Sequence, residues 1–196
     1  MADPAYIVDG VLTDGEAWVG LSTIDVTGTS TTIIVFESTD DGQVGDFSQY
    51  MDLFVVGYAS CIYAADSTLW MRYNLNDDAT GGNYITQDLR GDGSSVSASA
   101  TGATSVGWLP TNHLTAANVF GAYTVQFFDI NSGKYKSSMW TTAMDGNGSY
   151  DRVGMAASTW KSQAPITKIE IYEPNGFAFV AGSKFSLFGI LPRMVA

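Results

Sequence analysis

The residues of this chain that could do chemistry are mainly carboxylates, and most of these are aspartates in predicted turns. Asp145, Asn147, Ser149 and Asp151 place oxygen ligands at alternate positions, as in the first half of a calcium-binding loop. The segment lacks the downstream glutamate that completes such a loop, and a glycine-rich hairpin turn explains the same residues. We interpret it as a turn, keep calcium as the alternative, and expect no other metal or cofactor.

Catalytic groups are scarce. The only histidine, His113, falls in a predicted loop, and no serine occupies a G-x-S-x-G turn, so a serine–histidine pair is not indicated. The single cysteine, Cys61, lies in an apolar run and excludes an intrachain disulfide; we expect it to be buried. Glu170 stands between Ile169 and Ile171, which is typical of a solvated strand face. We predict that the protein is not an enzyme.

The amino-acid composition limits the classes of partner that this protein is expected to bind. Only 15% of residues are charged, and the formal net charge is −11. Such a surface repels phosphate backbones and anionic bilayers, so we expect neither nucleic-acid nor membrane binding. Neither a signal peptide nor an apolar run of the ~18 residues that a span requires is evident, which predicts retention in a cytoplasm. A weakly charged surface also suits contact with other proteins.

Alternation of apolar and polar residues predicts an all-β protein, an antiparallel β-sandwich with turns at the spacing typical of that class. Residues 1–20 read as an extended N-terminal arm and residues 21–196 as one domain. The expected strands cover residues 31–36, 50–64, 68–74, 84–90, 117–130, 134–144 and 150–160, while 94–105 reads as a surface loop or weak edge strand. A closing segment has strands at 166–171 and 185–190, with a turn at 173–176 and a short strand at 177–179 between them.

Apolar anchors and tryptophans are the candidate contact residues. The arm carries Tyr6, Ile7, Val8, Val11, Leu12 and Trp18. Trp70 alternates with Leu69 and Met71, which predicts that it faces outward, and Trp140 is a second candidate. Large aromatics are favoured at the centres of interfaces, although in a sheet they are more often part of the core.

The closing segment resembles the C-terminal part of β-sandwich domains in tailed-bacteriophage virion proteins. The pattern "I-x-x-I-x-I … G-x-x-F-x-x-G-S-x-F-x-L-[FY]-G-I" is matched by Ile166, Ile169, Ile171, Gly176, Phe179, Gly182, Ser183, Phe185, Leu187, Phe188, Gly189 and Ile190. Arg72, Tyr73 and Asn74 are similar to a second motif of these domains, a strand that pairs with the apolar strand preceding it. The resemblance covers mainly residues 50–75 and 117–191.

This resemblance implies a jelly-roll-like sandwich, often a homotrimer, that binds rather than catalyses. It implies a virion structural protein assembled in the host cytoplasm, most specifically a capsid decoration or cement protein that contacts the major capsid protein or other virion proteins. Two alternatives stay open. One is a receptor- or carbohydrate-binding module of a tail or tail fibre, served by exposed Trp70 and Trp140. The other is an acid-dependent enzyme, which would need two carboxylates facing each other in a pocket.

Overall fold

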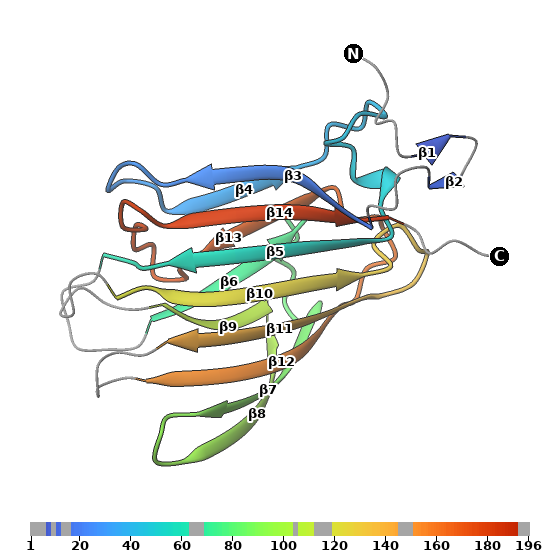
Figure 1. The fold of residues 1–196 in the computed structure, drawn as a ribbon. Coiled ribbons are helices and arrows are strands. Elements are labelled where there is room, and N and C mark those ends of the chain that lie inside the picture. The colour runs from blue at the N-terminus through green and yellow to red at the C-terminus, as the bar shows by residue number, and fades with distance from the viewer. Residues whose placement is uncertain are drawn as a thin grey trace.

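Two antiparallel sheets pack face to face in the computed structural model (Figure 1). The structure describes residues 7–8, 11–12, 17–62, 69–103, 106–111, 119–144 and 151–191, with side chains for all of these except 7, 8, 11, 12, 69, 101, 103 and 106–111. The large sheet has the order β3 (Trp18–Asp25), β14 (Lys184–Ile190), β5 (Asp52–Ala59), β10 (Gly121–Phe128), β11 (Lys136–Met144), β12 (Arg152–Trp160), β7 (Tyr84–Gly91) and β8 (Val96–Ala103). The small sheet has the order β4 (Ile33–Glu37), β13 (Lys168–Tyr172), β6 (Leu69–Leu75) and β9 (Val106–Thr111).

Eight of these strands are wound as a jelly roll. The large sheet contains β3-β14-β5-β10 and the small sheet contains β4-β13-β6-β9, so strands from the two ends of the chain lie side by side in both layers. All of their pairings are antiparallel. This double winding is the arrangement of jelly-roll sandwiches, and it confirms the predicted fold class.

The core lies between the sheets because alternate residues of each strand point inward. In β10 the residues Gly121, Tyr123, Val125 and Phe127 are all buried, as the sequence alternation predicts. The rings of Phe127 from the large sheet and Tyr73 from the small sheet meet edge to face at 5.0 Å. Cys61 is fully buried in the same core, as expected, and is a free thiol.

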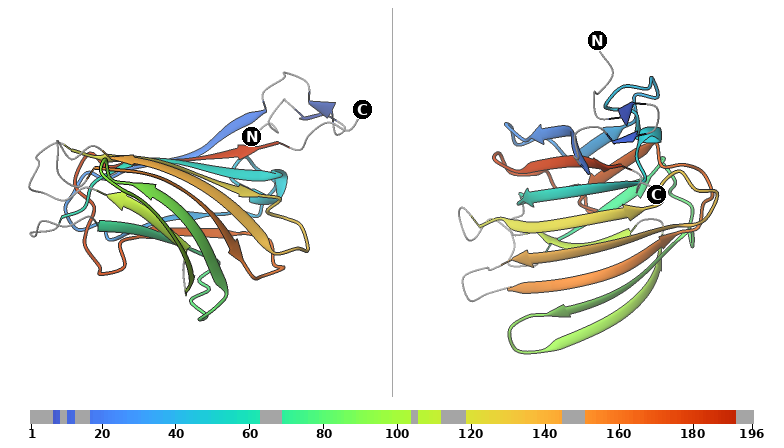
Figure 2. Two further views of the ribbon diagram at one scale, coloured as in Figure 1. Left: turned by 90° about the horizontal axis from the view of Figure 1, so that it is seen from below. Right: turned by 45° about the vertical axis from the view of Figure 1, so that its right-hand side comes forward.

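Four further strands extend the large sheet beyond the jelly roll. The hairpin β7–β8 is inserted between β6 and β9, and the hairpin β11–β12 between β10 and β13. They place β11, β12, β7 and β8 next to β10, with β8 as the outermost strand (Figures 1 and 2). Segment 94–105, predicted as a loop or weak edge strand, therefore contains an edge strand. Among the described residues, no helix has the length and apolar character needed to cross a bilayer.

The closing segment differs from the prediction in one respect. Residues 177–179 form no strand; Phe179 makes only an isolated bridge with Cys61. The reason is that β13 and β14 belong to different sheets, so the chain between them crosses the edge of the sandwich instead of turning back as a hairpin. Phe179 is nevertheless fully buried, because it packs edge to face on Phe185 at 4.9 Å.

The strand motif of residues 72–74 also pairs differently from what the resemblance implies. Strand β6 lies between β13 and β9 in the small sheet and does not pair with β5, the apolar strand that precedes it. In this jelly roll the chain passes from the large sheet to the small sheet between β5 and β6, so these two sequence neighbours do not pair. At the N-terminus, Ile7–Val8 (β1) pairs with Val11–Leu12 (β2), and β3 begins at Trp18, within the segment predicted as an arm.

Candidate functional site

The outer face of the large sheet is the most distinctive surface of the described structure. We use this name for the side of β5, β10, β11, β12, β7 and β8 that points away from the small sheet. One row of residues in register crosses all six strands. It consists of Val56, Thr124, Thr141, Met155, Leu89 and Ala98. Six strands spaced ~4.8 Å apart make this face roughly 24 Å wide, the scale of a macromolecular contact.

The outer face carries no charge over three adjacent rows. The rows on either side of the first consist of Tyr58, Ala122, Ala143, Val153, Gly91 and Val96, and of Phe54, Gln126, Met139, Ala157, Gln87 and Ala100. None of these residues is Asp, Glu, Lys or Arg, although the whole chain carries a net charge of −11. Several large apolar side chains stand out into solvent here; Val96 is 74% exposed and Val153 63%. Contiguous apolar surface of this kind marks protein contacts.

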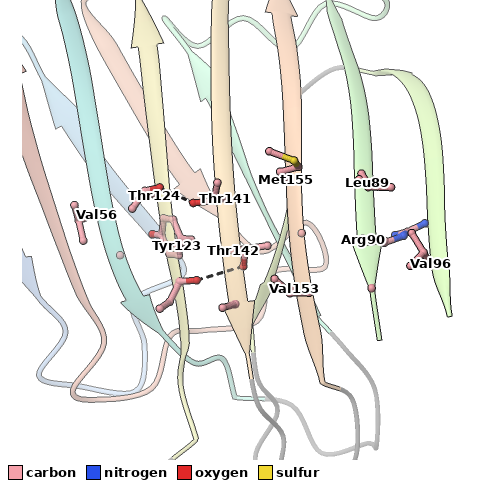
Figure 3. A pocket seen from close by; sticks show the side chains of 15 residues that line it. Val56, Leu89, Arg90, Val96, Tyr123, Thr124, Thr141, Thr142, Val153 and Met155 are labelled. Atoms are coloured by element: carbon pink, nitrogen blue, oxygen red, sulfur yellow. Dashed lines mark hydrogen bonds between the residues drawn. The ribbon is translucent and has the colours of Figure 1, made fainter. Parts of the chain in front are cut away.

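Two shallow hollows lie in this face. The larger, of about 670 Å³, runs from Val56 on β5 to Val96 on β8, and Figure 3 shows its lining. Its floor is low beside Val153 because Gly91, the partner of Val153 on β7, adds no side chain. The hydroxyls of Thr124 and Thr141 bond to each other at 2.9 Å, which leaves the surface with few unmet polar groups (Figure 3). This surface is suited to burying an apolar partner and holds no acid–base pair.

The second hollow, of about 580 Å³, adjoins the first along the strands, where Met139, Ala157 and Ala100 line it. Leu89 and Met155 line both hollows, and Met139 adds a flexible thioether side chain to the second. Methionine adapts its shape to different partners and is common at binding surfaces. Because they share Leu89 and Met155, the two hollows make one continuous apolar trough from β5 to β8.

A smaller polar pocket, of about 400 Å³, lies around Trp70 and Arg90. The Arg90 guanidinium sits 5.2 Å from the centre of the Trp70 ring, a cation–π arrangement. Arg90 also approaches Asp88 at 3.6 Å, and Arg152 approaches Asp92 at 3.6 Å. Each of these arginines thus has an acidic neighbour, so the pocket is balanced in charge.

Hydrogen bonds hold two acids of this region, Asp92 and Asp88, in fixed positions. Backbone N–H donation from Ser95, then hydroxyl and backbone donation from Ser94, hold the pKa of Asp92 well below its usual range. Asp88 accepts from the Ser99 hydroxyl with one oxygen, while its other oxygen is buried without a hydrogen bond. The indole N–H of Trp140 is likewise buried without a hydrogen bond. The hydrogen bonds of Asp88 and Asp92 connect β7, β8 and the turn between them, and so order the β7–β8 hairpin.

The three tryptophans predicted as contact residues differ in how far they are exposed to solvent. Trp18 is 48% exposed and packs edge-on against Phe54 at 4.8 Å, so it extends the outer face along β3. Trp70 is half-buried beside Arg90. The expectation that Trp140 faces outward is wrong: it is 2% exposed. Strand β11 buries alternate residues from Lys136 to Met144, and Trp140 falls in that inward set.

Other predicted residues are only partly described. Tyr6 and His113 lie outside the described residues, and for Ile7, Val8, Val11 and Leu12 the structure gives only the backbone pairing of β1 with β2. In the proposed calcium segment, Asp145, Asn147 and Ser149 also lie outside the described residues; Asp151 directly precedes β12. Within the described parts of the chain, no three His, Cys, Asp or Glu residues gather as metal ligands do.

Sequence reasoning missed the outer face as a unit. Its signal was present: Met139, Thr141 and Ala143 alternate with buried residues on β11, and Val153 and Met155 occupy alternate, exposed positions of β12. A solvent-facing side of a strand normally carries charge, so uncharged residues at these positions indicate a covered or contact surface.

Comparison of the chain with protein-family models and with curated proteins finds no match.

Proposed function

We propose that this chain is a structural protein of a tailed-bacteriophage virion, most specifically a capsid decoration or cement protein. The observation that carries the proposal is that the outer face of a jelly-roll sandwich carries no charge over three adjacent rows. A face about 24 Å wide, with Val153, Met155 and Leu89 exposed, supports binding to another protein and offers nothing for catalysis. The resemblance of the closing segment to phage virion domains points to the same class.

In this role the protein would stabilise the capsid mechanically, by binding across its subunits. Copies bound across junctions between major capsid proteins would bury their outer faces there, and opening the shell would re-expose that apolar surface to water. The N-terminal segment that carries Ile7, Val8, Val11 and Leu12 would add a contact with the capsid or a sister subunit. The resemblance further implies a homotrimer that is assembled in the host cytoplasm and retained in the virion. The net charge of −11 argues against direct contact with the packaged nucleic acid.

Imaging intact virions that carry a labelled chain tests this proposal. Density on the capsid lattice is expected; label confined to the tail contradicts the decoration role.

The contact surface is tested with Met155→Lys, which places a charge on the outer face, against Val35→Lys as a matched control. Val35 is a similarly exposed strand residue, but it lies on β4 of the small sheet. Only Met155→Lys should reduce occupancy on heads, by about tenfold or more. Equal occupancy of both variants would exclude the outer face.

A receptor- or carbohydrate-binding module of a tail or fibre is the second candidate. The pocket of Trp70, Arg90 and Arg152 favours it, because an aromatic ring beside ordered polar groups suits a sugar. Screening against a glycan array tests it: binding that is lost in Trp70→Ala supports this role. An absence of glycan binding, together with density on the capsid lattice, removes it.

A further inference from the structure

The four edge strands of the two sheets differ in how well they are protected against pairing with another chain. Edge strands of soluble proteins usually carry a charge, a proline or a bulge, or are very short, because an unprotected edge accepts a further strand. Three of the edges here have such features. Strand β3 contains Asp25 and a register shift opposite Leu187–Phe188; β9 contains Pro110 and a register shift; and β4 is only five residues long and ends at Glu37.

Strand β8 lacks all of these features. It has eight residues, Val96–Ala103, with the sequence VSASATGA, and pairs with β7 in unbroken register. It contains neither a charged residue nor a proline, and it is the last strand of the large sheet (Figure 1). Every second residue of such a strand directs its backbone N–H and C=O away from its one partner. Strand β8 is therefore the edge of the sandwich that is built to accept another strand.

We infer that β8 pairs antiparallel with β8 of a second copy of this chain, which joins two large sheets into one continuous sheet. The charge distribution of the chain favours a second copy as the partner of β8. Each copy has a net charge of −11, so two copies repel each other unless they meet through surface without carboxylates. The chain has no Asp, Glu, Lys or Arg from Gly93 to Phe128, a stretch that includes all of β8, β9 and β10.

The geometry of β8 also suits self-pairing. A two-fold axis places the same residues on both sides of the contact, so small side chains on one copy meet small side chains on the other. Val96, 74% exposed, and Ala98 lie on the outer face, so the uncharged outer faces of the two copies would adjoin across the new pairing. A two-fold contact yields dimers, or pairs of larger rings, whereas the trimer implied by the phage resemblance would use other contacts.

The test compares two lysine variants by sedimentation velocity over a wide range of protein concentration. Ala98→Lys adds a charge to β8, and Ser22→Lys adds the same charge to the exposed residue Ser22 of the protected edge strand β3. The wild-type protein and Ser22→Lys should form dimers, while in Ala98→Lys the dissociation constant should rise by about tenfold or more. Both variants lower the net negative charge equally, so general repulsion cannot explain the difference.

Cysteine variants provide a second readout that does not require β8 to be disrupted. Cys61 is fully buried, so a cysteine introduced at position 96, 98 or 100 would be the accessible thiol. Under mild oxidation, at least one of Val96→Cys, Ala98→Cys and Ala100→Cys should form a reducible covalent dimer, and Ser22→Cys should not.

A strictly monomeric wild-type protein, or a trimer that Ala98→Lys leaves unchanged and that none of the β8 cysteines crosslinks, would overturn the inference. The inference does not depend on the proposed function, because the experiment uses the isolated protein. A failure here leaves capsid binding open, and a failure of capsid binding leaves the dimer intact.

Discussion

The indole N–H of Trp160, at the end of β12, donates a 2.7 Å hydrogen bond to Oδ2 of Asp78, in the turn after β6. The side-chain amide of Asn83 donates to the same oxygen at 2.8 Å, and the backbone N–H of Thr80 donates to Oδ1 at 2.9 Å. Burial alone would raise the pKa of Asp78, but the bonds from Trp160, Asn83 and Thr80 together outweigh it and lower the pKa to about 2. This carboxylate ties the large sheet to a turn that leaves the small sheet.

Asp78 should make the stability of the fold depend on acid pH. Its pKa in the folded state lies below its ordinary value of 3.8, so its stabilisation is complete above that value and is lost as the pH falls toward 2. After allowance for solvent screening we expect about 1–2 kcal/mol. Asp78→Asn should lower the free energy of unfolding at neutral pH by that amount and flatten its decline below pH 4, as followed by urea unfolding. Asp25→Asn, at an exposed site, is the control; parallel pH curves for Asp78→Asn and the wild type would contradict the prediction.

Gly57 is required by a close approach within the large sheet. A Cβ added there would lie 1.9 Å from Cζ of Tyr123, its partner on β10, and the Tyr123 ring is buried. Gly57→Ala should destabilise the protein by about 3 kcal/mol, because the ring has no free space to enter. In Gly28→Ala no atom lies within 4 Å of the new Cβ, so that variant should change stability by less than about 0.5 kcal/mol.

A double variant checks the cause of this effect. Gly57→Ala combined with Tyr123→Leu should cost less than the sum of the two single changes, because the smaller side chain makes room for the methyl group. Thermal and urea unfolding measure all four proteins. Strict additivity would show that the ring contact is not the reason for the glycine.

Lys136 is a buried lysine whose ammonium group binds carbonyl oxygens. Only 2% of the residue is exposed, and Nζ donates to the carbonyls of Ser132 at 2.5 Å, Lys134 at 2.7 Å and Gln163 at 3.4 Å. Burial lowers the pKa of its ammonium group. Lys136→Met should cost about 1–3 kcal/mol, because these carbonyls lose their donor. Lys134→Met, where the side chain is 82% exposed, is the matched control and should be nearly neutral. Equal stability of the two variants would refute this role.

Cys61 should behave as an inert thiol in the folded protein. It is fully buried between the sheets and is the only cysteine in the chain. A thiol reagent such as an aromatic disulfide should label no cysteine under native conditions and one cysteine after unfolding. Rapid native labelling would show that the sandwich opens far more readily than its packing indicates.

Much of the fold could be predicted from alternation alone. The buried set on β10, from Gly121 to Phe127, and the hairpin partner β11 follow from a period of two and the turn between the strands. The partners of distant strands could not be predicted in this way. Strands β13 and β14 are neighbours in the chain, yet they join different sheets, because pairing across a jelly roll depends on the packing of the two layers.

The candidate site shows the same division. Alternation indicated that β11 has two faces but not which one the small sheet covers, and Trp140 proved to be inside while Met139 and Thr141 are outside. The outer face exists only because β11, β12 and β7 bring uncharged residues from three segments into register, and local sequence does not encode that register.

The amino-acid sequence by itself determined an all-β chain with an apolar, cysteine-bearing core and little surface charge, because side-chain period and composition act locally. Only the tertiary structure decided which strands share a layer, which tryptophan is buried, and that β8 is an unprotected edge. These properties depend on contacts between residues far apart in the chain, whose free energy is set by the packing of both sheets together.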